Sequence, residues 1–161
     1  MYSVCYMTSC SVLLLVAEAV LRSVGLTVPL LGFFFVAAAI AVSVRTAFGF
    51  ALVFGIALDF VTGTLSPWSG LLLPLLTLPA ISLRGKHRIS GGDEFLIGFG
   101  VPLVMAVPHI RTTLTSPEAF ASLLMSSLFG VLLFPLILSM VSRSTLRLKI
   151  GAAGEGKGGG I

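Results

Sequence analysis

The sequence predicts an all-α membrane protein folded as a bundle of six membrane-spanning helices. Apolar residues make up 57% of its 161 residues and charged residues only 10%, whereas a soluble domain carries about 25% charged residues to wet its surface. The mean hydropathy is +1.11. A spanning helix needs about 20 apolar residues, so the spans use up nearly the whole chain and leave no stretch for a soluble enzyme domain.

Six apolar stretches are separated by the few charges and by turn residues. They cover residues 3–21, 24–44, 46–65, 67–83, 95–110 and 118–141. The first basic residue, Arg22, follows the first stretch, so we expect a retained span and no cleaved signal peptide. Residues 1–150 are therefore predicted to form one transmembrane domain. Residues 151–161 are Gly-rich and poor in apolar side chains, which predicts a flexible cytoplasmic tail.

Helix is the expected state of all six stretches, because open backbone in hydrocarbon leaves its N–H and C=O groups unsatisfied. Capping residues mark two helix starts: Ser116 precedes Pro117 and Glu118, and Ser90 lies three residues before Asp93. Prolines inside the last three stretches predict kinks. These prolines are Pro74, Pro79, Pro102, Pro108 and Pro135.

The distribution of Lys and Arg predicts that both termini are cytoplasmic, since basic residues accumulate on the inner side of a membrane. With six spans, only Arg22 and Arg111 fall on the outer side. The inner side then holds Arg45, Arg84, Lys86, Arg88, Arg143, Arg147, Lys149 and Lys157. Without the fifth span these charges would divide evenly, so six spans are favoured. The charges do not decide whether the first stretch crosses fully.

The third stretch carries small residues and one acid at every fourth position, which places them on one helix face. This face holds Ala47, Ala51, Gly55, Asp59 and Gly63. Such spacing lets a second backbone approach closely, the usual basis of helix packing in lipid. An acid within a span costs about 2.5–3.5 kcal/mol on insertion scales, so Asp59 is expected to face protein. Its role stays open between fixing the following turn and contacting a partner or ligand.

The last stretch repeats this pattern. Glu118 is followed at the same spacing by Ser122, Ser126 and Gly130, which predicts a second packing face. At the end of the first stretch, Glu18 and Arg22 are four residues apart and are expected to form an ion pair.

The loop after the fourth stretch concentrates positive charge in Arg84, Lys86 and Arg88. This predicted cytoplasmic basic surface has two interpretations: it orients the chain and contacts anionic lipid, or it docks a cytoplasmic partner. The net charge of +4 follows from this inner-side bias and gives no reason to expect nucleic-acid binding.

Residues that carry catalysis or bind metals are sparse. Neither His87 nor His109 has further ligands at metal-binding spacing, and Cys5 and Cys10 do not share a helix face. No nucleophile motif, phosphate-binding loop or pair of acids is recognisable. We therefore expect no metal, no cofactor and no enzymatic activity.

The pattern Gly55-x-x-Leu58-Asp59-x-x-x-Gly63, followed by a tight turn and another span, resembles the MreD family. Pro135 inside the last span also matches that family, as do the basic inner loop and the basic end after the last span. Two positions depart from the pattern: Pro67 stands where Gly is usual, and Ala51 stands where Gly is frequent.

The resemblance implies a non-enzymatic multi-pass scaffold of the bacterial plasma membrane that serves cell elongation and rod shape. Its partner would be an MreC-like single-span protein, with MreB and peptidoglycan synthases in the same machinery and a second copy of the chain as a further candidate. MreD-like proteins are also similar in architecture to the six-span substrate-binding component of energy-coupling-factor vitamin transporters.

That similarity makes vitamin binding the alternative function. It would require a polar pocket near the outer face, for which the candidates are Asp59, Thr62, Thr64 and His109. The first stretch lacks the Ala-x-x-x-Ala motif common in those components. A channel or secondary transporter would need more polar residues within the membrane.

Overall fold

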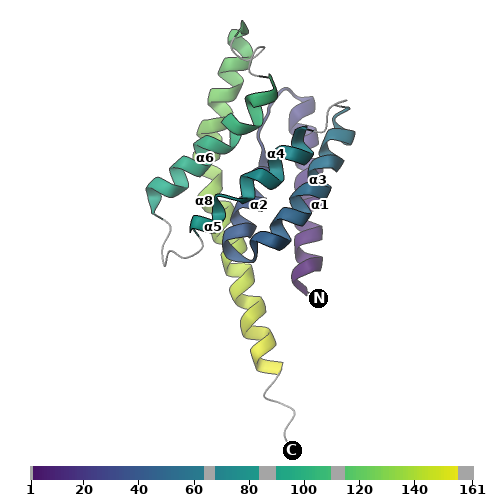
Figure 1. The fold of residues 1–161 in the computed structure, drawn as a ribbon, viewed down its shortest axis with the longest axis vertical. Helices are drawn as coiled ribbons and strands as arrows, with labels where there is room; N and C mark the ends of the chain where they lie inside the picture. Colours follow the sequence, from purple (N-terminus) through teal and green to yellow (C-terminus); the bar gives the residue numbers. More distant parts are fainter. Residues whose placement is uncertain (1, 64–67, 84–89, 110–114, 156–161) are drawn as a thin grey trace, which may run out of the picture.

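The computed structural model describes residues 2–63, 68–83, 90–109 and 115–155, and within them every element is helical (Figure 1). The elements are α1 (Tyr2–Ser23), α2 (Leu30–Ala41), α3 (Val44–Val61), α4 (Trp68–Thr77), α5 (Ala80–Leu83), α6 (Gly91–Ala106), η1 (Val107–His109) and α8 (Pro117–Glu155). Among the described residues, four stretches are long and apolar enough to cross a membrane: Val4–Ser23, Val44–Val61, Gly91–His109 and Pro117–Ser144. The predicted all-α class is confirmed, and these four helices are those of a membrane protein.

The second apolar stretch forms a much shorter helix than predicted. Residues 24–44 were expected to span, but α2 covers only Leu30–Ala41, because Pro29 lies at its N-cap and residues 24–29 form a connector. Twelve residues of helix are about 18 Å long, whereas the hydrocarbon core of a bilayer is about 30 Å thick. The prediction of a full-length second span was therefore wrong.

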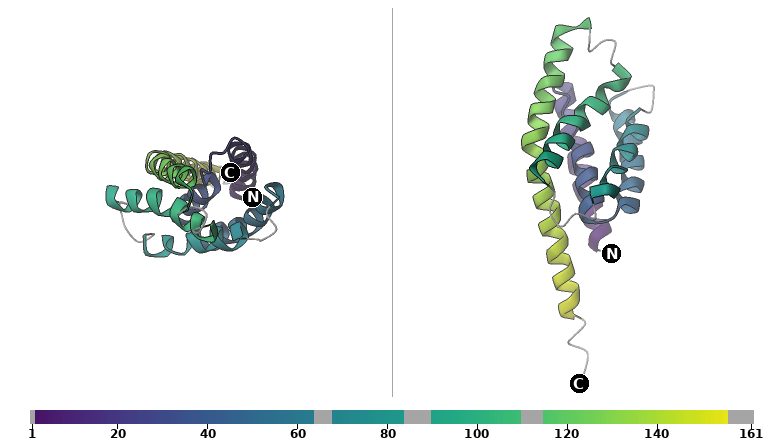
Figure 2. Two further views of the ribbon diagram at one scale, coloured as in Figure 1. Left: turned by 90° about the horizontal axis from the view of Figure 1, so that it is seen from above. Right: turned by 60° about the vertical axis from the view of Figure 1, so that its left-hand side comes forward.

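Burial explains why α2 is so apolar. Its residues 31–39 are all buried, and α2 contacts each of α1, α3, α4, α5, α6 and α8. Seen along the bundle, α8 and α1 lie on one side of α2, while α3, α4 and α6 form an arc on the other (Figure 2). A helix that is apolar on all sides is the expected core element of such a bundle.

The fourth stretch is divided into two helices. α4 ends at Thr77 and α5 begins at Ala80, with Leu78 and Pro79 between them. Proline lacks the N–H that a helix needs and clashes with the preceding turn. The interruption falls where the sequence placed a kink, whereas the helices continue through Pro74, Pro102 and Pro135.

The predicted caps set the starts of α6 and α8. Ser90 accepts a hydrogen bond from the Asp93 N–H, and the Asp93 carboxylate accepts one from the Ser90 N–H, which together form a capping box. Ser116 accepts a bond from the Ala119 N–H at the start of α8. Because of the capping box, α6 begins four residues before the predicted start at Phe95.

α8 is longer than the stretch that predicts it. It runs from Pro117 to Glu155, about 58 Å of helix, and extends past the rest of the bundle (Figure 1). The helix thus continues into residues 151–155, which had been predicted as flexible tail. Residues 156–161 lie outside the described residues.

The helices alternate in direction, so that the ends of some helices lie beside the starts of others. The start of α1 and the far end of α8 point toward the same end (Figure 1). The ends of α1, α3 and α6 and the starts of α4 and α8 meet at the opposite end (Figures 1 and 2). α3 packs against α4, and α6 packs against α8.

Candidate functional site: a cavity at the end of the bundle

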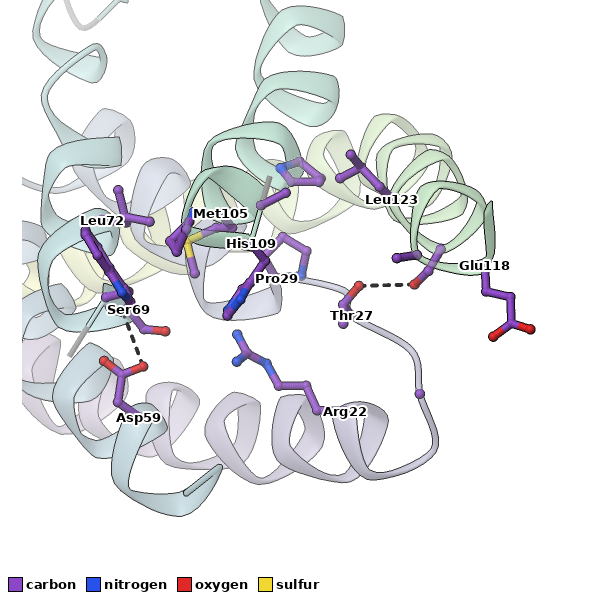
Figure 3. A pocket seen from close by; sticks show the side chains of 17 residues that line it. Arg22, Thr27, Pro29, Asp59, Ser69, Leu72, Met105, His109, Glu118 and Leu123 are labelled. Atoms are coloured by element: carbon purple, nitrogen blue, oxygen red, sulfur yellow. Dashed lines mark hydrogen bonds between the residues drawn. The ribbon is translucent and has the colours of Figure 1, made fainter. Parts of the chain in front are cut away.

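A cavity of about 650 Å³ lies where the ends of α1, α3 and α6 meet the starts of α4 and α8 (Figure 3). The α1–α2 connector and η1 complete its walls. The lining comprises Arg22, Gly25, Thr27, Pro29, Asp59, Trp68, Ser69, Leu72, Pro102, Met105, Ala106, Pro108, His109, Glu118, Ala119, Ser122 and Leu123. This volume falls within the range of about 300–1,000 Å³ that is typical of small-molecule sites.

Asp59 caps the start of α4 at the cavity wall. Its side chain is only 4% exposed. One carboxylate oxygen accepts a hydrogen bond from the Ser69 N–H at 3.3 Å, and the other accepts one from the Gly70 N–H at 3.0 Å. The first N–H groups of a helix have no partner within that helix, and a carboxylate there also interacts favourably with the helix dipole. Asp59 thus links the end of α3 to the start of α4.

Gly55 brings α3 and α4 into close contact. A Cβ atom at this position would lie 2.6 Å from the Ser69 carbonyl oxygen and 2.8 Å from the Gly70 Cα. Both are backbone atoms, so no side chain could rotate away to make room. This close approach is what brings the N–H groups of α4 within reach of Asp59.

Glu18 performs the same task for α2. Although it belongs to α1, its buried carboxylate accepts a hydrogen bond from the Leu31 N–H at 2.9 Å. Its other oxygen accepts one from Arg22 Nη2 at 2.8 Å, which confirms the predicted ion pair. Pro29, at the N-cap, offers no side-chain hydrogen bond. Both short inner helices are thus capped by an acid from a longer neighbour.

The second predicted packing face, which includes Ser122, Ser126 and Gly130 of α8, also makes contacts within the chain. Ser126 donates a hydrogen bond to the Thr27 carbonyl oxygen at 2.7 Å, and the Ser122 and Thr27 hydroxyls lie 3.2 Å apart. A Cβ on Gly130 would collide with the Gly98 carbonyl oxygen, and one on Gly98 would lie 2.7 Å from the Val131 Cα. This face of α8 therefore fixes both the connector between α1 and α2 and the crossing of α6 with α8.

These contacts correct one part of the sequence interpretation. Ala47, Ala51, Gly55 and Asp59 do share a buried face of α3, but α2 and α4 of the same chain cover it. These four residues are therefore buried within the chain itself. Gly63 does not belong to that face: α3 ends at Val61, and Gly63 is an exposed residue of the following turn, with a φ of 68° that favours glycine.

The remaining predicted residues fall in three places: the cavity, the described chain outside the cavity, and the undescribed part of the chain. Of the four ligand candidates, Asp59 and His109 line the cavity. Thr62 donates its hydroxyl to the Leu58 carbonyl oxygen at 2.8 Å within its own helix end. Thr64 lies outside the described residues, as do Arg84, Lys86 and Arg88 of the predicted basic surface.

Sequence reasoning missed two residues of the packing face of α6. Gly98 and Pro102 are buried on α6, and their spacing of four residues is the same signal that identified the face of α3. The position of Arg22 at the cavity was also missed, since its pairing with Glu18 does not reveal which cavity lies beside it.

Within the described ranges, no group of three or more His, Cys, Asp or Glu side chains is placed to hold a metal ion. No model of a known protein family, no curated protein and no solved structure matches the chain. Fold and site together define a helical membrane protein with a ligand-sized cavity at one end of its bundle.

Proposed function

We propose that the protein is a non-enzymatic membrane scaffold of the MreD type that serves bacterial cell elongation. One observation carries this proposal: the residues that resemble the family work together in one structural unit. Gly55 sets the close approach of α3 and α4, Asp59 caps α4, and Gly63 turns the chain between them. A motif that builds a helical hairpin is more informative than the same residues scattered over a lipid-facing surface.

The proposed topology places the cavity toward the outer face and the far end of α8 in the cytoplasm. In this arrangement the α1–α8 side presents large apolar side chains such as Leu13 and Leu132, which are about 70% exposed. An MreC-like single-span helix would pack on such an apolar surface. The part of α8 beyond the bundle would face cytoplasmic components of the elongation machinery.

The test is depletion in the native host, with cell shape as the readout. Rounding of the cells, rescued by the wild-type protein, would support the scaffold. Rescue by Gly55→Leu should fail, whereas rescue by Gly49→Leu should succeed, because a Cβ on Gly49 has no neighbour within 4 Å. Immunoblots of the membrane fraction establish that both variants insert. Normal cell shape after full depletion would refute the proposal.

A second candidate function is supported by the cavity itself. A substrate-binding component of a vitamin transporter needs a ligand-sized pocket near the outer face, and the cavity with Asp59 and His109 lies at that end in the proposed topology. Loss of uptake of one vitamin, with cell shape unchanged, would favour this alternative over the scaffold.

A further inference from the structure

Most of the cavity wall is apolar, and one large aromatic side chain belongs to it. Leu72, Met105 and Leu123 lie on three different helices around the space (Figure 3). Trp68, the first residue of α4, adds its indole ring to the lining. An aromatic ligand gains from the burial of its apolar surface and also from ring contacts with a tryptophan. The wall therefore favours a ligand with an aromatic body.

The charged side chains of the lining are compensated within the chain. Arg22 donates a hydrogen bond to Glu18 at 2.8 Å, so this pair is neutral as a whole. Asp59 accepts hydrogen bonds from the first N–H groups of α4, whose positive helix end offsets its charge. The carboxylate of Glu118, at the rim, points away from the cavity (Figure 3). A charged ligand would lose its hydration here without gaining a counterion, so the lining favours an uncharged ligand.

One buried hydroxyl points into the cavity without a partner. Ser69 is only 5% exposed, and its N–H is bonded to Asp59. Its hydroxyl points toward the cavity (Figure 3) and makes no hydrogen bond within the described chain. By contrast, the hydroxyls of Thr27 and Ser122 lie 3.2 Å apart and bond each other. A nearly buried hydroxyl without a partner is stabilised by a ligand group that accepts or donates a hydrogen bond.

We propose that this cavity binds an uncharged aromatic molecule that carries a hydrogen-bonding group such as an amide. The ring lies between Trp68 and the apolar wall, and the amide bonds the Ser69 hydroxyl. This inference goes beyond the scaffold role and does not depend on it. Binding is measured on the purified protein, so its outcome is separate from the cell-shape test of the scaffold.

Trp68 provides the assay, because it lines the cavity and is the only tryptophan of the chain. Nitrophenyl groups quench tryptophan fluorescence at contact distance. The protein, in nanodiscs of phosphatidylcholine at pH 7, is titrated with 4-nitrobenzamide, 4-nitrobenzoate and 4-nitrobenzylammonium, which are similar in size and differ in charge. 4-Nitrotoluene, which is neutral but lacks the amide, controls for partition into the bilayer. N-acetyltryptophanamide in empty nanodiscs corrects for absorption by the probes.

The amide should be the preferred probe. We expect saturable quenching by 4-nitrobenzamide at a concentration about tenfold lower than for either ion, because burial of an ion without a counterion is unfavourable. 4-Nitrotoluene should partition more strongly into the bilayer, yet its saturable quenching should require a concentration about fivefold higher than that of the amide, as the loss of one hydrogen bond implies.

Two pairs of variants locate the site. Ser69→Ala removes the hydroxyl but keeps the N–H for Asp59, and it should weaken binding of the amide about fivefold while leaving 4-nitrotoluene unchanged. Its control is Ser127→Ala, because Ser127 is also buried without a hydrogen-bond partner but does not line the cavity. Ala119→Phe fills the cavity and should abolish saturable quenching, whereas Ala121→Phe, an exposed position outside the cavity, should not.

Three results would overturn the proposal. Tighter or equal binding of either ion would mean that the charges of the lining are not compensated. Equal binding of the amide and 4-nitrotoluene, or an unchanged affinity of the amide in Ser69→Ala, would mean that the cavity is only an apolar extension of the bilayer. Absence of saturable quenching, or quenching that persists in Ala119→Phe, would mean that no aromatic ligand binds in the cavity.

Discussion

Replacing Gly55 by alanine tests the central packing claim, that the α3–α4 hairpin depends on backbone contact. The new Cβ would lie 2.6 Å from the Ser69 carbonyl oxygen, whereas ordinary contacts of this kind begin at 3.4 Å. α4 must therefore move away by about 0.8 Å to restore an ordinary contact, the difference between 3.4 and 2.6 Å. The hydrogen bond from the Ser69 N–H to Asp59 is already 3.3 Å long, so this movement would break it.

The energetic cost has two parts. Overpacking a tight site costs about 1–3 kcal/mol, and a hydrogen bond to a charged group contributes about 1.5–3 kcal/mol. Partial relaxation reduces their sum, so we expect a loss of free energy of unfolding on the order of 3 kcal/mol relative to a control with the same change of residue type. Gly49→Ala is that control, because it lies on the same helix and its Cβ would have no neighbour within 4 Å. Both variants share the gain in helix propensity.

The measurement is reversible unfolding by SDS in mixed micelles, followed by the fluorescence of Trp68. Gly55→Ala should unfold at a clearly lower SDS fraction than Gly49→Ala. Equal unfolding midpoints for the two variants would refute the argument, since the close approach of α3 to α4 would then have no energetic consequence.

Three further predictions concern the other contacts of the bundle. Asp59→Ala leaves the Ser69 and Gly70 N–H groups without their acceptor and should lower the free energy of unfolding by about 1–3 kcal/mol; Asp59→Asn, which retains one acceptor oxygen, should lose less in the same SDS titration. Gly98→Ala should destabilise the α6–α8 crossing by about 1–3 kcal/mol, whereas Gly100→Ala, whose Cβ would have no neighbour within 4 Å, should not; the reverse order of midpoints would contradict the crossing geometry. Ser126→Ala removes the hydrogen bond to the Thr27 carbonyl oxygen and should lower the free energy of unfolding by about 0.5–1.5 kcal/mol. A cysteine introduced at Thr27 should become more reactive toward a thiol reagent when Ser126 is also replaced by alanine.

Local chemistry in the sequence predicts the starts of α6 and α8 well. Ser90 with Asp93, and Ser116 before Pro117, act through hydrogen bonds between residues three apart, so their partners are close along the chain. The pair of Glu18 and Arg22 is predictable for the same reason.

Long-range contacts account for what sequence reasoning missed. The small residues and the acid at every fourth position of α3 identify a packing face. Their spacing does not distinguish a helix of the same chain from a partner protein. Likewise, the second stretch is apolar enough to be read as a span, and only its burial against six other helices shows that it is a short inner helix.

The sequence by itself determined the all-α class, the membrane character and the capping residues of α6 and α8, because these follow from composition and from interactions over a few residues. Only the tertiary structure decided that Glu18 caps α2, that Asp59 caps α4, and that Arg22 faces a cavity at the end of the bundle. The reason is physical: each of these arrangements depends on how elements distant in the chain meet, and the periodicity of one helix does not encode which neighbour it will contact.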